Sequence, residues 1–385
     1  METKRNHDLS EEELAQVRKA MEDFRNTPVV KAEEPEPPAE PPEKPIKKRK
    51  KWIAWVAVAA VMLAVAIVLV MWFNRYWLGP NPMAHRSNTV SVGNAVYIIG
   101  EDGDLYLYNP FEDEIKTIPE WNDLIFMDSN FSCVIGLRKN GTVMYLGNVA
   151  EECLQWKGLK AVAAGAGHVV GLQKNGTVVA VGPNGCGQCE VGDWEDIVGI
   201  TAGYYFTAGL RRDGTVVITP LMPDAAIIGT VMSQAGYDAL RTELQKTEQW
   251  TDVVAISADM YHIAGLKKDG SVVAAGANNA GQCNVEGWKN VVSIYVGNNM
   301  TVGVCADGSV LVAGEQKLFD ETERSLTEEI RRLTSGKRVV SAYGTSVGIY
   351  VLCDDGKLYC IERVRNVSMN NVLWLKPIMY EVKLP

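Results

Sequence analysis

The feature that most limits how this chain can fold is a short turn sequence that recurs seven times after residue 100. In each copy, Asn-Gly or Asp-Gly stands between two runs rich in apolar residues. Such a turn needs positive φ, which Asn, Asp and Gly adopt most easily, so each copy predicts a β-hairpin. The seven turn glycines are Gly103, Gly141, Gly176, Gly214, Gly270, Gly308 and Gly356. Successive glycines are 38, 35, 38, 56, 38 and 48 residues apart, a spacing typical of repeat proteins.

Most repeats carry a second mark, a tryptophan followed by a short apolar strand. The clear copies begin at Trp121, Trp156, Trp194, Trp250 and Trp288, and a further copy at Gly336 lacks the tryptophan. One unit therefore supplies three strands, and a sheet that small cannot cover its own faces. A ring of such sheets covers every face. We therefore expect residues 89–385 to form an all-β, seven-bladed β-propeller.

The closure of the ring depends on the strands at its two ends. Eight strands of the kind that opens each unit occur for seven hairpins, from Thr89–Val92 to Val372–Leu375. We expect the two terminal copies to share one blade, with Ile378–Val382 pairing along its edge. A ring of eight blades is the alternative.

Two units resemble the repeat of the regulator of chromosome condensation superfamily. Residues 167–188 run GHVVGLQKNGTVVAVGPNGCGQ, and residues 261–283 run YHIAGLKKDGSVVAAGANNAGQC. The short period and the Gly-Gln-Cys form are closer to the bacterial branch than to the nuclear exchange factor. The resemblance extends over residues 89–385 and implies a seven-bladed propeller that works by binding proteins, with a Gram-positive bacterium as the source.

A single membrane anchor is predicted ahead of the repeats. Residues 52–73, WIAWVAVAAVMLAVAIVLVMWF, contain no charge, and this length can cross about 30 Å of hydrocarbon as a helix. The basic run Lys47–Lys51 precedes it, so the positive-inside rule places the N-terminus in the cytoplasm and the C-terminal domain outside the cell. The run is too long for a cleaved signal peptide, and no small-residue cleavage site follows it.

A short amphipathic helix is predicted within residues 1–27. Ser10 and Glu13 form a capping box for a helix over residues 10–25. Its apolar face consists of Leu14, Val17, Met21 and Phe24. This helix either docks on a cytoplasmic partner or remains a frayed tail, since alone it would be marginal in water.

Two connecting segments flank the anchor. Residues 28–51 are rich in Pro and Glu and end in the basic run, so they predict an extended spacer without a packed core. Residues 74–88 form a short stalk between the anchor and the propeller.

The sequence supplies no catalytic, cofactor or metal site. Cys186-Gly-Gln-Cys189 is a lone pair, and the other cysteines are not spaced to complete a zinc site. We expect free, half-buried thiols, with one or two disulfides as the alternative. No nucleophile with a base and an orienting group is evident, nor any P-loop or dinucleotide motif. The net charge of −9 argues against nucleic-acid binding. We therefore expect no enzyme activity and no cofactor.

Two histidines mark one position of the repeat. His168 and His262 each lie eight residues before their turn glycine, which predicts a structural role in fixing a loop. The amides that follow in the same units are expected to bond loop backbone; they are Asn184, Gln188, Asn278 and Gln282.

Two insertions break the regular spacing, at residues 221–249 and 316–335. Each contains an amphipathic helix, and the second begins with a Ser325/Glu328 capping box. We expect both to rise from one face of the propeller and to bracket a cleft, since insertions of this kind often bind. The candidate partner-binding residues are Tyr237, Leu240, Leu244, Leu326, Ile330 and Leu333. The alternative is that each helix merely covers its own blade.

These features favour a single-pass cell-membrane protein whose extracellular propeller binds a protein or a glycan. A protein inhibitor of a secreted or cell-wall enzyme is the second hypothesis, and an enzyme is the third. The sequence identifies neither the partner nor the oligomeric state.

Overall fold

The computed structural model describes residues 90–92, 96–100, 102–109, 114–130, 133–147, 150–224, 227–228, 231–315, 325–344, 348–355, 357–362 and 379–383. The predicted helix at 10–25, the spacer at 28–51, the anchor at 52–73 and the stalk at 74–88 lie outside these ranges. No helix within the described ranges is both long and apolar enough to cross a membrane.

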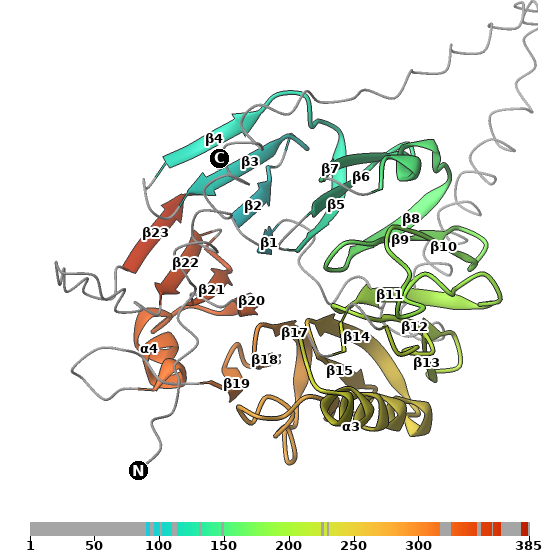
Figure 1. The fold of residues 1–385 in the computed structure, drawn as a ribbon. Coiled ribbons are helices and arrows are strands. Elements are labelled where there is room, and N and C mark those ends of the chain that lie inside the picture. The colour runs from blue at the N-terminus through green and yellow to red at the C-terminus, as the bar shows by residue number, and fades with distance from the viewer. Residues whose placement is uncertain are drawn as a thin grey trace, which may run out of the picture.

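Seven antiparallel sheets stand side by side around one axis (Figure 1). Sheets 1 to 3 consist of β1 (Val90–Val92), β2 (Val96–Ile99), β3 (Leu105–Asn109) and β4 (Glu114–Ile118); β5 (Leu124–Ser129), β6 (Cys133–Arg138) and β7 (Val143–Gly147); and β8 (Leu159–Ala164), β9 (Val169–Gln173) and β10 (Val178–Val181). Sheets 4 and 5 consist of β11 (Ile197–Ala202), β12 (Thr207–Arg211) and β13 (Val216–Ile218), and of β14 (Val253–Asp259), β15 (His262–Lys267) and β16 (Val272–Gly276). Sheets 6 and 7 consist of β17 (Val291–Gly297), β18 (Met300–Cys305) and β19 (Val310–Gly314), and of β20 (Val339–Gly344), β21 (Gly348–Cys353), β22 (Lys357–Glu362) and β23 (Met379–Lys383).

The first strand of each sheet lies nearest the axis. Neighbouring first strands contact each other all the way round, in the order β1, β5, β8, β11, β14, β17, β20 and back to β1. The Asn-Gly and Asp-Gly turns join the second strand of each sheet to the third, so they all lie on one face of the ring. We call this the Asx-Gly face; the turns between first and second strands lie on the opposite face.

The predicted seven blades are confirmed by the seven sheets. That the two terminal copies share a blade stays a prediction, because one of them is not described. Strand β1 pairs with β2 in sheet 1, whereas β23 extends sheet 7 by pairing with β22. A strand at the C-terminus does therefore pair along an edge, as predicted, although Val372–Leu375 lies outside the described ranges. Sheets 1 and 7 meet through a cluster of buried side chains, Val96, Ile98, Tyr108, Tyr343, Tyr350 and Leu358.

The turn glycines link each sheet to the next through one recurring hydrogen bond. The carbonyl oxygen of Gly103 accepts the N–H of Leu124, the first residue of β5, at 3.0 Å, and the Gly176 oxygen accepts the Ile197 N–H in the same way at 3.0 Å. The same bond follows Gly141, Gly214 and Gly270. These glycines have φ near +80° to +90°, a region that a side chain disfavours. The Asn-Gly and Asp-Gly turns therefore form both the hairpin and the link to the neighbouring sheet.

The tryptophan mark pairs with a glycine that the sequence did not single out. In each of five sheets, a side-chain carbon placed on the central glycine of the second strand would lie within about 3 Å of the tryptophan ring; the pairs are Gly136–Trp121, Gly171–Trp156, Gly209–Trp194, Gly265–Trp250 and Gly303–Trp288. Sheets 1 and 7 have no such tryptophan, and Ile98 and Val351 occupy the glycine position there. Trp and Gly therefore form one packing unit.

Because each regular sheet has three strands, its third strand ends on the face opposite the start of the next sheet. The chain must cross back along the outer edge of the ring. In sheet 1 the strand β4 makes this crossing; elsewhere loops make it, with short 3₁₀ turns at Glu151–Gln155 and Lys246–Gln249. The two insertions lie in such crossings and contain α3 (Gln234–Gln245) and α4 (Leu326–Leu333).

The Trp–Gly unit can be tested by adding one methyl group. Gly209→Ala would place a carbon 2.9 Å from the Trp194 ring, so we expect a loss of about 1–3 kcal/mol in the free energy of unfolding, measured by urea denaturation. Gly192→Ala is the matched control, because no atom lies within 4 Å of the added carbon. Equal effects of the two substitutions would contradict this account of the tryptophan mark.

Candidate binding face

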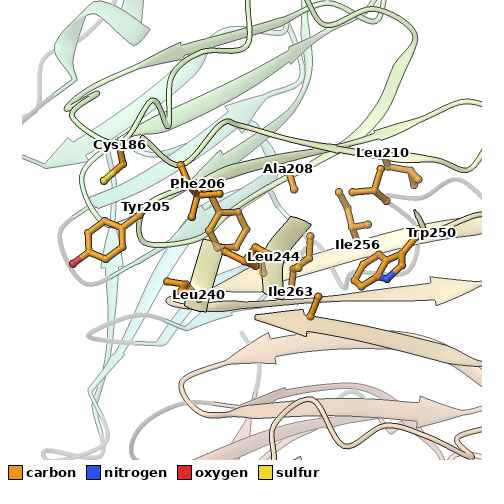
Figure 2. Close-up of a cluster of buried hydrophobic side chains, with 14 of the residues drawn as sticks. Cys186, Tyr205, Phe206, Ala208, Leu210, Leu240, Leu244, Trp250, Ile256 and Ile263 are labelled. Atoms are coloured by element: carbon orange, nitrogen blue, oxygen red, sulfur yellow. The ribbon is translucent and has the colours of Figure 1, made fainter. Parts of the chain in front are cut away.

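The helix α3 fills the outer space between sheets 4 and 5. Its apolar residues Tyr237, Leu240 and Leu244 are buried and belong to one cluster with side chains of both sheets. Figure 2 shows Leu240 and Leu244 beside Phe206 of sheet 4 and Ile263 of sheet 5. The Tyr237 hydroxyl donates to the carbonyl oxygen of Met222 at 2.7 Å, which fixes the crossing segment to the helix.

The helix α4 occupies the corresponding space between sheets 6 and 7. Leu326 and Ile330 are buried, Leu333 is partly buried, and all three pack against both sheets. The predicted capping box is confirmed, since the Ser325 hydroxyl accepts the Glu328 N–H while the Glu328 carboxylate accepts the Ser325 N–H.

The prediction that both insertions rise from one face and bracket a cleft is therefore wrong for the two helices. Each helix packs on the outermost strand of a regular sheet, β16 for α3 and β19 for α4, so both lie along the outer edge (Figure 1). The physical reason is the crossing that a three-stranded sheet imposes on the chain. Five of the six candidate partner-binding residues are buried and Leu333 is partly buried, so in this structure a partner would contact these helices mainly through their polar faces.

The two repeat histidines join neighbouring sheets, as their predicted structural role requires. The Thr207 hydroxyl donates to the carbonyl oxygen of Gln188 at 2.7 Å, so it accepts the Nε2–H of His168 at 3.0 Å. His262 bonds Thr301 at 3.1 Å, and the Thr301 hydroxyl donates to the Gln282 carbonyl at 2.8 Å. Burial lowers the pKa of both histidines to about 4, so both rings are neutral at pH 7.

The predicted amide contacts in the loops are also confirmed. The side-chain oxygens of Gln188 and Asn184 accept the N–H groups of Cys186 and Cys189, at 2.9 and 2.8 Å. Gln282 and Asn278 do the same for Ala280 and Cys283. These residues therefore hold the crossing loops in shape.

Three tyrosines gather on the face opposite the Asx-Gly turns. Tyr204 and Tyr205 belong to the turn between β11 and β12, and Tyr261 belongs to the turn between β14 and β15. The rings of Tyr204 and Tyr261 are stacked at 5.8 Å, and that of Tyr205 meets Tyr204 edge-on at 4.7 Å. The Tyr204 N–H donates to the carbonyl oxygen of Met260 at 2.7 Å, which ties the two turns together. We call this side of the ring the tyrosine face.

The chemistry of the tyrosine cluster suits a binding surface. Tyr204 and Tyr261 are partly exposed, so their rings present apolar area and hydroxyl groups to solvent. The Tyr205 hydroxyl is buried beneath them, beside Tyr261. Met222, which is 42% exposed, lies on the same face, where the chain leaves β13.

The backbone beside this cluster is strained at two apolar residues. Leu221 has φ of 44° and Met260 has φ of 41°. The other described non-glycine residues with positive φ are all Asp or Asn, which tolerate this region far better. Strain of this kind persists only where the surrounding structure enforces it, and it concentrates at functional sites.

The strand ends of two distant sheets, 2 and 5, meet on the tyrosine face. The Asn130 amide, at the end of β5, donates to the Asp259 carboxylate, at the end of β14, at 3.3 Å. Burial raises the pKa of Asp259 to about 6, and the nearby Asp128 carboxylate acts in the same direction. Asp128 also accepts the N–H of Ala164 in the next sheet at 3.0 Å.

Sequence reasoning missed these residues although one signal was available. Asp259 stands where the neighbouring repeats have Gly165, Gly203 and Gly297. Tyr204 and Tyr205 likewise stand where the preceding repeat has the small residues Ala166 and Gly167, although sheet 2 has Phe131 at the Tyr204 position. Departures from the repeat on one face would have indicated this surface.

The two partly exposed cysteines of the described ranges, Cys189 and Cys283, are poor nucleophiles. The described thiols form no disulfide with one another. Burial raises the pKa of Cys189 to about 11 and that of Cys283 to about 12, so both remain protonated and weakly nucleophilic. No group of three or more His, Cys, Asp or Glu in the described ranges could hold a metal ion.

Comparison with known proteins agrees with this fold. Residues 159–188 match the Regulator of chromosome condensation (RCC1) repeat. Prp20p from Saccharomyces cerevisiae is similar in structure, with a TM-score of 0.51 and 14% identity over 66% of this chain and 79% of that chain. The ectodomain of the receptor kinase CR4 from Physcomitrella patens gives a TM-score of 0.47 and 16% identity over 73% of this chain and 75% of that chain. No curated protein matches the sequence. The chain thus contains an RCC1 repeat and folds as an RCC1-like β-propeller.

The buried histidines predict a stability that falls in acid. An unfolded histidine has a pKa near 6.5, so between about pH 6.5 and 4 the unfolded chain binds protons that the native chain does not. Protonation of the unfolded chain therefore lowers the free energy of unfolding by up to about 3 kcal/mol per histidine. We therefore expect the Tm values of the wild type and of H168Q/H262Q, measured by thermal melts, to converge as pH falls from 7 to 4. Only the wild type loses stability through histidine protonation, because glutamine cannot be protonated. Asp259 makes both proteins more stable in acid, so its effect cancels in the comparison. Parallel plots of Tm against pH would contradict the claim that the buried histidines are neutral.

Proposed function

We propose that this chain is a membrane-tethered binding protein whose propeller stands outside the cell and holds a protein or a glycan on the tyrosine face. The observation that carries the proposal is the cluster of Tyr204, Tyr205 and Tyr261. Their three rings come together from the turns of two neighbouring sheets, whereas the equivalent turn of sheet 3 is only Gly165-Ala166-Gly167. Aromatic side chains with exposed rings are the commonest anchors of protein interfaces, and they also stack on sugars.

The propeller fold supports a binding role. Prp20p, which has this fold, binds Gsp1p and histones. For the present chain we propose only that such a propeller can bind a protein. The histidine and threonine links keep neighbouring sheets in fixed positions, so the turns form a rigid platform. A rigid platform binds with less loss of conformational entropy than a mobile loop does.

The membrane tether rests on the sequence. The uncharged run at residues 52–73 and the basic residues before it favour a single span with the propeller outside. Labelling of intact cells with a membrane-impermeant maleimide tests this orientation. We expect K174C, on an exposed hairpin turn, to be labelled in intact cells, and T3C to be labelled only after lysis. The reverse pattern would contradict the tether as proposed.

The tyrosine face is tested by substitution of two partly exposed rings. Full-length protein in detergent is incubated with cell-envelope protein and, separately, with purified wall polysaccharide. We expect Y204A/Y261A to retain at least about tenfold less of the bound component than the wild type, since each anchor contributes more than about 1 kcal/mol. The control variant K139A/K174A changes the opposite face. Equal retention by both variants would exclude the tyrosine face as the binding surface.

A further inference from the structure

The tyrosine face carries charge of one sign only. Within the described ranges it consists of the turns between first and second strands and of the segments in which the chain leaves a third strand. These residues are 128–130, 165–168, 203–206, 259–261, 297–299, 182–190, 219–224, 277–284 and 315. They include no Lys or Arg, and they include five carboxylates, Asp128, Glu190, Asp224, Asp259 and Glu315. This face is therefore acidic as well as aromatic.

The Asx-Gly face differs, because charges of both signs lie on it. The turns of sheets 2 to 5 carry seven basic residues, Arg138, Lys139, Lys174, Arg211, Arg212, Lys267 and Lys268. Carboxylates lie among them, namely Asp123, Asp196, Asp213, Asp252 and Asp269. Other described basic residues, such as Arg241 and Lys246 of α3, lie on the outer edge. The acidic character of the tyrosine face is thus a local property of that surface.

The carboxylate of Asp259 has no cation of the chain beside it within the described ranges. Its Oδ1 accepts the Met260 N–H at 2.8 Å and the Asn130 amide at 3.3 Å, whereas its Oδ2 accepts no hydrogen bond from a described residue. The side chain is partly exposed. Its pKa is about 6, so the carboxyl is mostly ionised at pH 7. A charge in this position attracts a cation from outside the chain.

A second carboxylate lies beside the tyrosine cluster, on the crossing loop from sheet 3 to sheet 4. A side-chain carbon at Gly187 would lie 2.7 Å from Met222 and 3.5 Å from Glu190, so these two side chains border the same point of the surface. The Met222 N–H donates to the carbonyl oxygen of Cys186 at 2.8 Å. Cys186 in turn belongs to the same buried cluster as Tyr205 (Figure 2). The exposed carboxylate of Glu190 is therefore part of the same patch as the tyrosines.

The chain itself shows how a tyrosine and a carboxylate together hold a cation. In sheet 7 the Nζ of Lys337 lies 4.0 Å from the centroid of the Tyr359 ring and 3.8 Å from Oδ2 of Asp355. The Tyr359 hydroxyl donates to the same carboxylate oxygen at 3.0 Å. No described Lys or Arg makes this contact with Tyr204 or Tyr261. Their partly exposed rings are therefore open to a cation from another molecule.

We propose that the tyrosine face binds a basic segment of a partner protein, with a Lys or Arg side chain against the rings of Tyr204 and Tyr261 and beside the Asp259 carboxylate. This inference rests on the proposed function and adds the chemical class of the partner. Met222, which is 42% exposed, offers apolar area to the aliphatic stem of such a side chain. The ring faces and the carboxylate receive its charge.

Two defined peptides test the charge that this face selects. The first is a short fluorescent peptide of alternating Gly and Lys, and the second is the same peptide with every lysine acetylated, which removes the charge and keeps the stem. Binding to the full-length wild-type protein in detergent is measured by fluorescence anisotropy. We expect the acetylated peptide to bind at least about tenfold more weakly. Equal affinities, or no binding of the lysine peptide, would overturn the proposal.

Two variants with the same net charge test where the lysine peptide binds. E190Q/D259N removes two carboxylates from the tyrosine face, and D213N/D269N removes two from the Asx-Gly face. The second pair is a matched control, because Asn already stands at this turn position in two other repeats. We expect at least about fivefold weaker binding by E190Q/D259N and less than about a twofold change in the control. Equal weakening by both pairs would indicate attraction to the overall charge and would overturn the proposal.

Failure of this inference and failure of the proposed function give different results. If the wild type binds both peptides equally while Y204A/Y261A loses wall polysaccharide, the tyrosine face binds a glycan and only the inference is wrong. If neither Y204A/Y261A nor E190Q/D259N weakens binding of the lysine peptide, the peptide binds elsewhere and the inference is wrong. The proposed function is wrong as well if Y204A/Y261A also retains every envelope component.

Discussion

The ring depends on the hydrogen bond between the carbonyl oxygen of each turn glycine and the first N–H of the next sheet. This bond recurs from Gly103 to Gly270 with lengths of 3.0 to 3.1 Å. It requires a backbone with positive φ at the glycine, and it brings the next strand so close that a side chain there would crowd it. A hairpin turn and a contact between sheets are thus one feature. Because the turn has both roles, its sequence varies less from repeat to repeat than the sequence of any strand.

The parts of the fold that depend on neighbouring residues could be predicted from the sequence. The hairpins, the capping box of α4 and the roles of His168 and His262 follow from short patterns whose partners lie within one repeat or in the next. The position of α3 and α4 on the outer edge could not be predicted in this way. It follows from the odd number of strands in each regular sheet. After three strands the chain is on the tyrosine face, whereas the next sheet begins on the Asx-Gly face. The chain must therefore cross back along the outer edge, and an insertion in that crossing lies on the edge.

The candidate binding surface escaped prediction for a related reason. The sequence directs attention to the repeated residues and to the apolar stripes of the two insertions, such as Leu240 and Leu244, and these stripes proved to be core. Asp259, Tyr204 and Tyr261 matter because they do not recur. In a ring of similar sheets the shared positions maintain the ring, so a specific surface can arise only at positions where one sheet differs from the others.

The junction between sheets 1 and 7 has a mechanical consequence. Every other pair of adjacent sheets is joined by continuous chain, whereas this pair meets, within the described residues, through side-chain packing such as that of Val96 and Tyr350. In sheet 1 the strand nearest the junction is β1, which pairs with β2. Tension transmitted through the N-terminal segment would act on this strand first and peel it away one hydrogen-bonded pair at a time. The disc would then open at this junction before any of the other six sheets lost a strand.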